Sequence, residues 1–439
     1  MSVAIIGLGF VGLTLALALA DKGVRVFGVE TNPITYKKLS QGISTFNEKG
    51  IEQYLARCSG KTFQVFSTLE GFPAKPDFYI ICVATPILEG NPIMTQLKTA
   101  TESVGKHMSG NELVIVRSTC PVGTTREFVL PLLEEELKKR NISKSIKIVF
   151  APERTAEGVA LKELNELPQI VGGLDEECAI KAIDLFRQLT PTVIEVSSLE
   201  TAEMIKLIDN SFRDVRFAYA NEISILAEKL GVDAHECIKK ANIHYARNNI
   251  PFPSPGVGGP CLSKDPYLLA GSKNILETIS NYQSIIVSGR NVNERIPEIL
   301  SEKIKKYLKS MNKTSKEIKI FVMGFAFKGE PETSDIRESP TLVLVENLIK
   351  DYKIYGHDPV VPKEEIEKNN VTPIGIEDGF KNSDCIIIMN NHKMYRNLDI
   401  QKLVQDSPKP CLFVDCWRLY DKKIFAKFSD VSYTGIGIL

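Results

Sequence analysis

The sequence predicts an α/β protein in which two doubly wound parallel-sheet domains are joined by a central helical domain. Three observations support this fold class. Short apolar runs alternate with longer amphipathic segments at both ends of the chain, and the middle contains a long helical stretch without Gly or Pro. The 439 residues are too many for one ordinary core. We therefore expect three domains, at residues 1–198, 199–309 and 310–439.

The N-terminal third predicts a parallel sheet with crossover helices. Its buried strands are expected in runs rich in Val and Ile, at residues 3–9, 24–30, 78–85, 112–119 and 146–153. Amphipathic segments between these runs, such as 11–21 and 96–107, predict helices. Alternation of strand and helix is the pattern of a doubly wound sheet.

The middle of the chain predicts helices separated by a loop. Residues 199–230 lack Gly and Pro, and they carry an apolar stripe at three- and four-residue steps, formed by Ile205, Ile208, Phe212, Val215 and Tyr219. A polar row runs along the same helix through Lys206, Asn210, Arg213, Asp214 and Asn221. Such a row is usually the solvated side opposite the core. A second helix is expected at about 274–309, and the Pro- and Gly-rich residues 248–261 predict a loop.

The C-terminal part repeats the pattern of the N-terminal part. After a polar linker at 310–317, apolar runs predict strands at 318–327, 353–359, 385–391 and 411–416, with a helix at 341–350. Asp358 ends the second of these strands, as an acidic residue does in a nucleotide-binding half. The only tryptophan, Trp417, is expected to pack rather than to stack on a base.

Composition excludes several classes of protein. Lys+Arg and Asp+Glu both number 54, so no basic field attracts nucleic acid or an anionic membrane. No apolar run approaches the ~18–20 residues that span a bilayer. The first residues enter a strand without a signal-peptide pattern, which argues against secretion. Nine cysteines without a CxxC pair, and five histidines without a metal-ligand spacing, predict no metal and a reducing cytoplasm.

A glycine-rich turn predicts a dinucleotide site and a Rossmann-like domain. Gly7, Gly9 and Gly12 form GLGFVG directly after the first strand, and Phe10-Val11 open the following helix. Such glycines allow a tight turn, a close approach of pyrophosphate and close helix packing at a helix N-terminus. Glu30 ends the next strand, where a carboxylate binds a ribose hydroxyl and repels a 2′-phosphate, favouring NAD over NADP. The alternative is a merely structural turn.

Hydroxyl side chains close the third and fourth predicted strands. These are Thr85, Ser118 and Thr119. Ligands of open α/β sheets sit at the carboxyl ends of strands, so these hydroxyls are expected to face the cofactor crevice. The alternative is that they cap the following helices.

The loop GVGGPCLSKD at 256–265 predicts a reactive cysteine. Its glycines let backbone approach a ligand, and Cys261 stands near Lys264 and Asp265 in a segment without apolar periodicity. We hypothesise that NAD oxidises a primary alcohol to an aldehyde, that the Cys261 thiolate adds to it, and that a second NAD produces a thioester, which water hydrolyses. Lys206 and Asn210 would stabilise oxyanions. Asp265 or Glu153 would help to activate the water, with Thr119 positioning it.

Six segments resemble the UDP-glucose/GDP-mannose dehydrogenase family, in family order and over nearly the whole chain. They are GLGFVG, STCPVGTT (118–125), APERTAEG (151–158), EMIKLIDNSFRDV (203–215), GVGGPCLSKD (256–265) and GFAFKGEPETSDIRESP (324–340). The resemblance implies a nucleophilic Cys261 flanked by Lys206 and Asn210, with Glu153, Thr119 and Asp265 serving hydrolysis. It implies NAD contacts that include Val11, Thr85, Lys264 and Arg337. It also implies a C-terminal domain that holds the UDP-sugar, with Lys328 and Arg418 near its phosphates and sugar.

The resemblance further implies a substrate branch and an assembly. APERT and NSFRDV resemble the branch that oxidises UDP-N-acetylhexosamines, especially UDP-N-acetylmannosamine. Sugar contacts are then expected from Arg154, Thr155, Arg213, His244, Arg247 and Gly258. The central helix pairs family members into dimers, and Arg247 is the candidate to reach a partner's sugar. Pro260 stands where the branch often has His, and the His244–Arg247 spacing differs from the expected one.

Several alternatives stay open. Within the family, UDP-N-acetylglucosamine or UDP-glucose are alternative substrates. A two-electron dehydrogenase of the hydroxyacid or 6-phosphogluconate type would use Lys206 and Asn210, but it needs neither Cys261 nor a second α/β domain. A non-catalytic NAD-binding regulatory protein would need none of these residues. The three classes predict two, one and no NADH per sugar.

Overall fold

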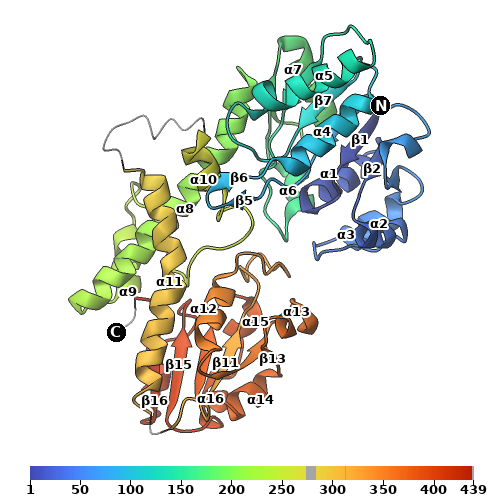
Figure 1. Ribbon diagram of the computed structural model, residues 1–439. Coiled ribbons are helices and arrows are strands. Elements are labelled where there is room, and N and C mark those ends of the chain that lie inside the picture. Colours follow the sequence, from blue (N-terminus) through green and yellow to red (C-terminus); the bar gives the residue numbers. More distant parts are fainter. Residues whose placement is uncertain (273–282, 312, 438–439) are drawn as a thin grey trace. The chain divides into compact units, whose positions relative to one another are not determined.

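A computed structural model describes residues 1–272, 283–311 and 313–437. The chain forms two compact units (Figure 1). Unit 1 comprises Met1–Asn210 and the segment that begins at Tyr267, and unit 2 comprises Ser211–Pro266 and the segment that begins at Gln283. The long helix α8 (Leu199–Leu230) begins in unit 1 and continues in unit 2. Among the described residues, no helix is both long and apolar enough to cross a bilayer.

Unit 1 is built on a sheet with the strand order β10-β9-β8-β7-β4-β1-β2-β3. The strands are β1 (Ser2–Ile6), β2 (Arg25–Val29), β3 (Phe63–Phe66), β4 (Phe78–Ile81), β7 (Leu113–Val116), β8 (Lys147–Phe150), β9 (Gln169–Gly173) and β10 (Val193–Val196). In the described part of this sheet, neighbouring strands are parallel except β8 and β9, which are antiparallel. The expected parallel sheet is therefore confirmed, with one antiparallel step.

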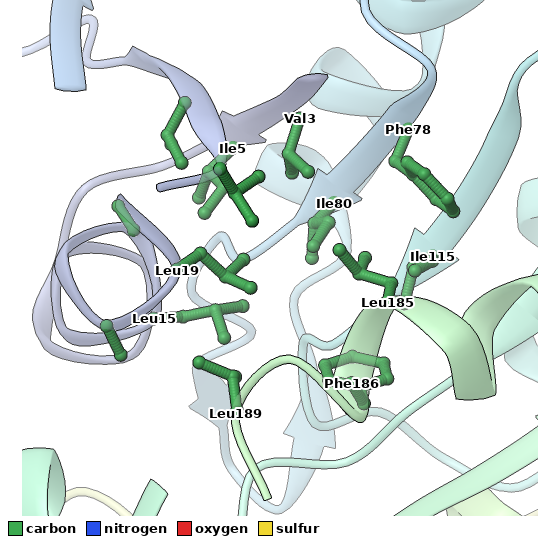
Figure 2. Packing of buried hydrophobic residues seen from close by; sticks show 14 of the residues in the cluster. Val3, Ile5, Leu15, Leu19, Phe78, Ile80, Ile115, Leu185, Phe186 and Leu189 are labelled. Carbon is green, nitrogen blue, oxygen red and sulfur yellow. The ribbon is translucent and has the colours of Figure 1, made fainter. Parts of the chain in front are cut away.

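The central strands of unit 1, such as β1, β4 and β7, are buried on both faces, which is why they appear as continuous apolar runs. In β1, Val3 and Ile5 point into one core and Ala4 and Ile6 into the other. Figure 2 shows the first of these cores, where Ile5 lies near Leu15 and Leu19 of the first helix. Helices thus cover both faces, as a doubly wound sheet requires.

The two helices expected at 11–21 and 96–107 are present, as α1 (Phe10–Asp21) and α4 (Thr95–His107). The second, α4, is buried on one side, whereas the first, α1, is buried all round from Gly12 to Ala20 and is therefore not amphipathic. The other major helices of unit 1 are α2 (Pro33–Ser40), α3 (Ile51–Cys58), α5 (Leu130–Lys139), α6 (Ala160–Glu166) and α7 (Glu176–Phe186). A π-helical turn at Thr125–Val129 leads into α5, and a short hairpin of β5 (Ile87–Leu88) and β6 (Asn91–Pro92) follows β4.

Unit 2 contains the second sheet, with the strand order β13-β12-β11-β14-β15-β16, all parallel in its described part. The strands are β11 (Lys319–Met323), β12 (Lys353–His357), β13 (Thr372–Pro373), β14 (Cys385–Ile388), β15 (Cys411–Asp415) and β16 (Val431–Thr434). This is the order 3-2-1-4-5-6 of a dinucleotide-binding fold, and β3-β2-β1-β4-β7-β8 of unit 1 has the same order. Both ends of the chain are therefore Rossmann-like.

Helices cover both faces of the second sheet. One face packs against α11 (Ile285–Leu308) and α12 (Pro340–Leu348), through apolar residues such as Ile304 and Leu344 (Figure 1). The other face packs against α14 (Ile376–Lys381), α15 (Lys393–Arg396), α16 (Ile400–Gln405) and α17 (Lys422–Phe425). The remaining helices are α9 (Ala234–Asn242), α10 (Asp265–Ala270) and α13 (Lys363–Glu367). Trp417 packs against the core and donates to the Met389 carbonyl, as expected of a packing residue.

On the long helix α8, a polar row is buried and part of the expected apolar core stripe is exposed, which reverses the expectation. Lys206, Asn210, Asp214 and Asn221 are all at most 7% exposed. By contrast, Ile208, Phe212 and Tyr219 of the expected core stripe are 46–60% exposed. The usual interpretation of such a row, a solvated side, does not apply here, because Asp214 and Asn221 have buried polar partners on α11. The second helix was expected at 274–309; it spans Ile285–Leu308, and residues 274–282 lie outside the described part.

Candidate functional site

The glycine turn of unit 1 has the geometry of a phosphate-binding loop. Gly7 has φ of +91°, and a side chain on Gly12 would lie 1.8 Å from the Gly7 carbonyl oxygen, so both positions require glycine. Gly9 precedes α1 and has open space where its side chain would be. Phe10 and Val11, at the start of α1, are half-buried. The turn therefore leaves room for a pyrophosphate at a helix N-terminus, which fits NAD.

Acidic side chains support the first turn of each sheet. In unit 1, Glu30 Oε2 accepts a hydrogen bond from the Leu8 N–H at 3.2 Å. In unit 2, Asp358 Oδ2 accepts from the N–H groups of Phe325 and Ala326 at 2.7 and 3.1 Å. The acid at the end of the second strand thus orders the turn after the first strand in both units. This similarity agrees with the expected role of Asp358 as the counterpart of Glu30.

The hydroxyl side chains at the strand ends of unit 1 lie together but bond to backbone. Thr85 Oγ1 donates to the Thr119 carbonyl, and Ser118 Oγ donates to the Val83 carbonyl at 2.7 Å. They tie the ends of β4 and β7 together, and neither is the N-cap of α4 or of the turn before α5. A contact of Thr85 or Ser118 with the cofactor stays a prediction.

A buried ionic cluster surrounds Glu153 in unit 1. Arg117 donates from Nε and Nη2 to Glu153 Oε2 at 3.1 and 2.5 Å, and the N–H groups of Arg154 and Thr155 donate to Oε1 at 2.7 and 2.8 Å. Burial alone would raise the pKa of Glu153, but the Arg117 charge, these hydrogen bonds and the Lys206 charge together lower it. Glu153 is therefore ionised at neutral pH, and both of its carboxylate oxygens already accept hydrogen bonds.

We expect Glu153→Gln to destabilise unit 1 and to remove part of its pH dependence. The lowered pKa means that ionised Glu153 stabilises the fold above the ordinary carboxyl pKa, and that this stabilisation is lost as the pH falls through the folded-state pKa. The variant leaves the buried Arg117 charge without a counter-ion, which costs about 3–5 kcal/mol. Thermal unfolding at pH 7 and pH 4 checks this: the difference between variant and wild type should shrink at pH 4. Equal differences at both pH values would contradict the role of the charge.

The start of α8 brings further predicted residues to the same unit. Lys206 and Asn210 are 7% and 5% exposed. Arg154 Nε lies 2.9 Å from Oδ2 of Asp209, which precedes Asn210. The Thr155 hydroxyl is buried and has no hydrogen-bond partner among the residues that the structure describes. Lys206 and Asn210 are therefore shielded from water, as oxyanion stabilisation requires, whereas Arg154 is exposed.

Glu203, also on α8, was not predicted as a site residue. Its carboxylate accepts from the Gly123 N–H at 2.5 Å and from the N–H and hydroxyl of Thr125 at 2.8 and 2.6 Å. It thereby ties the segment that follows Thr119 to the helix that carries Lys206. Arg117 was missed as well, although a charged residue at the end of an apolar strand was a usable signal.

Unit 2 contains the cysteine loop. Cys261 is exposed, and its carbonyl oxygen accepts from the N–H groups of Lys264 and Asp265 at 3.2 and 2.9 Å. Asp265 is fully buried at the start of α10, and its Oδ1 lies 2.7 Å from Lys264 Nζ. Side chains on Gly258 and Gly259 would lie 2.1 Å from the Glu338 carbonyl oxygen and 2.7 Å from the Phe327 ring. Packing within unit 2 thus accounts for both glycines.

The other predicted residues of unit 2 are dispersed. Arg213, His244 and Arg247 are exposed, so Arg213 does not share the buried polar row of α8. Lys328 is half-buried beside Phe327, and Arg337 pairs with Asp335 at 2.5 Å. Arg418 donates from both terminal nitrogens to Asp233, which also caps α9. In the described residues, no cluster of His, Cys, Asp and Glu is able to hold a metal ion.

Comparison with known proteins assigns each part of this architecture. Residues 1–190, 200–295 and 321–422 match the NAD-binding, central and UDP-binding domains of the UDP-glucose/GDP-mannose dehydrogenase family. Two Rossmann-like domains, a glycine turn that fits NAD and these matches define an NAD-dependent nucleotide-sugar dehydrogenase. The chain belongs to the UDP-glucose/GDP-mannose dehydrogenase family.

Individual relatives are similar over almost their full length. A UDP-N-acetyl-D-mannosamine dehydrogenase of Methanocaldococcus jannaschii is 32% identical, covering 97% of this chain and 94% of the relative. One from Campylobacter jejuni is also 32% identical, covering 92% of this chain and 98% of the relative. The solved UDP-D-ManNAc dehydrogenase of Pyrococcus horikoshii aligns with a TM-score of 0.87 at 32% identity, covering 100% of this chain and 99% of that one.

Proposed function

We propose that this enzyme oxidises the C6 alcohol of UDP-N-acetyl-D-mannosamine to the carboxylate, with Cys261 as covalent catalyst. One observation carries the proposal. Cys261 is exposed on a loop whose glycines, Gly258 and Gly259, pack so closely against the rest of unit 2 that no side chain would fit at either position. Because packing fixes the backbone of this loop, a nucleophile on it is held in one place, which suits attack on a positioned aldehyde. Similarity to dehydrogenases of this substrate over most of the chain supports the choice of sugar.

The covalent steps balance in atoms and electrons. Oxidation of the alcohol to the aldehyde removes a hydride from the carbon, which is two electrons with one proton, and a second proton from the hydroxyl. The Cys261 thiolate then adds to the aldehyde carbon and forms an alkoxide, whose second two-electron oxidation leaves a thioester. Water attacks this thioester, the carbon–sulfur bond breaks, and the carboxylate leaves with the thiolate regenerated. NAD supplies the electron acceptor in both oxidations, so two molecules are consumed per sugar.

Buried residues of unit 1 supply the electrostatics of this chemistry. We assign Lys206 and Asn210 to the oxyanions, because a buried ammonium and a buried amide are strong donors away from water. Glu153 is a weak proton acceptor, since its pKa is lowered. We therefore assign acceptance of the water proton to Asp265, with Thr119 positioning the water.

The remaining contacts are proposed as the family resemblance implies them. NAD contacts are proposed for Gly7, Gly9, Phe10, Val11, Gly12, Glu30, Thr85, Ser118, Lys264 and Arg337. The sugar is assigned to Arg154, Thr155, Arg213, His244, Arg247 and Gly258, and the nucleotide to Lys328 and Arg418. The contact of Gly258 is through its backbone, because packing against Glu338 already explains the missing side chain.

A substrate panel tests the choice of sugar. Initial rates of NADH formation are compared for UDP-N-acetylmannosamine, UDP-N-acetylglucosamine and UDP-glucose at equal concentrations. We expect kcat/KM to be highest for UDP-N-acetylmannosamine. A higher value for either other sugar would reassign the substrate within the family. No NADH from any of them would favour the non-catalytic alternative.

We also propose a homodimer formed through α8. Phe212, Tyr219, Leu226 and Leu230 share one helix face and are 48–76% exposed in the single chain. Large apolar side chains in a row on a surface helix indicate a protein interface. We expect Phe212→Glu with Tyr219→Glu to halve the molar mass measured by light scattering. Ile34→Glu, an exposed apolar residue on α2, is the control. A wild-type mass of one chain would refute the dimer.

A further inference from the structure

A buried charged pair joins the two long helices within unit 2. Asp214 of α8 is fully buried and Arg290 of α11 is 1% exposed. Arg290 Nη1 lies 2.7 Å from Asp214 Oδ1. Removing two charges from water costs about as much as their attraction returns, so such a pair is weak evidence for a role in stability. The chemistry proposed above uses neither side chain.

Both terminal nitrogens of Arg290 also reach the cysteine loop, while its Nε lies 3.1 Å from Glu294 Oε1 on the same helix. Nη2 donates to the Val257 carbonyl at 2.8 Å, and Nη1 also donates to the Leu262 carbonyl at 3.2 Å. Leu262 directly follows Cys261, and Val257 lies four residues before it. One planar guanidinium therefore holds the backbone on both sides of the cysteine, which a flexible ammonium cannot do in the same geometry.

A neighbouring pair of amides holds the start of the same loop. Asn293, one turn after Arg290 on α11, donates to the carbonyl and the carboxylate of Asp214, both at 2.9 Å. Its Oδ1 accepts from Asn221 at 2.9 Å, and Asn221 Oδ1 accepts from the Ser254 N–H at 2.8 Å. The side chains of Asp214, Asn221, Arg290 and Asn293 are all at most 2% exposed. The network is thus satisfied mainly by itself and by the loop backbone.

We propose that Arg290 is a positioning residue, which fixes the Cys261 thiol by clamping the Val257 and Leu262 carbonyls while Asp214 and Asn293 orient the guanidinium. The inference rests on the covalent role of Cys261 proposed above. The Cys261 carbonyl is itself held by the start of α10, so the two consecutive peptide groups after the Cys261 α-carbon, Cys261–Leu262 and Leu262–Ser263, have fixed partners. A displacement of about 1 Å in a catalytic group can cost about 100-fold in rate.

Two variants separate positioning from simple stabilisation. Arg290→Lys keeps a charge beside Asp214 but loses the planar fork. The double variant Asp214→Asn with Arg290→Met removes both charges, keeps an acceptor for Asn293 and removes the clamp. No buried ion is left unpaired, since the remaining partner of Arg290, Glu294, is 47% exposed. Arg295→Met, an exposed arginine on the same helix, is the matched control. Each protein is assayed for kcat and KM and for hydrogen exchange of the amides at 263–265.

The clamp predicts a loss of rate without a matching loss of binding. We expect kcat of the double variant to fall about 100-fold and that of Arg290→Lys about tenfold, with KM for the UDP-sugar within about threefold. Exchange at 263–265 should accelerate in both variants and not in the control. Wild-type kcat in a folded double variant would overturn the proposal. If the wild type itself oxidised no UDP-sugar, the proposed function would fail, while the exchange rates would still decide whether Arg290 holds the loop.

Discussion

Replacing Cys261 with Ser is expected to lower kcat by about 10³-fold or more, which corresponds to at least about 4 kcal/mol of transition-state stabilisation. A serine hydroxyl is almost fully protonated at neutral pH, so it adds to an aldehyde poorly without an activating base. The thioester, which is the species that water hydrolyses, cannot form at all. KM for the UDP-sugar should change little, because the substitution removes no proposed binding contact.

Cys237→Ser is the control for this substitution. Cys237 is also exposed and also belongs to unit 2, but it lies on α9 outside the glycine loop. Its variant should retain the wild-type kcat. A folded Cys261→Ser variant with undiminished turnover would mean that the cysteine is structural and that the oxidation proceeds without a covalent intermediate.

Gly9→Ala is expected to raise KM for NAD by about tenfold or more, equivalent to about 1.4 kcal/mol, while leaving the fold intact. Gly9 has φ of −67° and ψ of −167°, which alanine adopts readily, and nothing lies within 4 Å of the added carbon. The open space is where a pyrophosphate would approach the backbone. Substrate saturation curves for NAD, together with thermal unfolding, measure both effects.

The Rossmann-like sheet of unit 2 provides a matched control for Gly9. Gly375 has φ of −68° and ψ of 157°, precedes α14 as Gly9 precedes α1, and also has nothing within 4 Å of an added side chain. Gly375→Ala should change neither stability nor KM for NAD. Gly12→Ala should instead destabilise unit 1, because its side chain would collide with the Gly7 carbonyl. An unchanged KM in Gly9→Ala would contradict NAD binding at this turn.

Strong local patterns predicted most of the fold. Strands with both faces buried, such as β1 and β7, are continuous Val- and Ile-rich runs, and α8 has no helix breaker over its whole length. The strands that were missed are short or weakly apolar. β10 contains an exposed glutamate, and β13 has two residues of which one is Pro, so their pairing depends on neighbouring strands. Such context is not visible in a local pattern.

The burial of the polar side of α8 was not predicted for the same reason, because it depends on residues far away in the sequence. A helix with one apolar and one polar side is normally buried on its apolar side. Here the polar side is buried because Asp214 and Asn221 find partners on α11, about 70 positions later in the chain, and the apolar side is left for another surface. The site residues with motif signatures, such as the glycine turn and Cys261, were visible in sequence. Arg290 and Glu203 were not, because they act through backbone groups of distant segments.

The most direct test of the account is the amount of NADH formed per mole of limiting UDP-N-acetylmannosamine. The reaction is run to completion with excess NAD, and the product is checked for a carboxylate by mass spectrometry. The covalent four-electron mechanism predicts two moles of NADH and a uronate. One mole of NADH with an aldehyde product would contradict it and would make this chain a two-electron dehydrogenase.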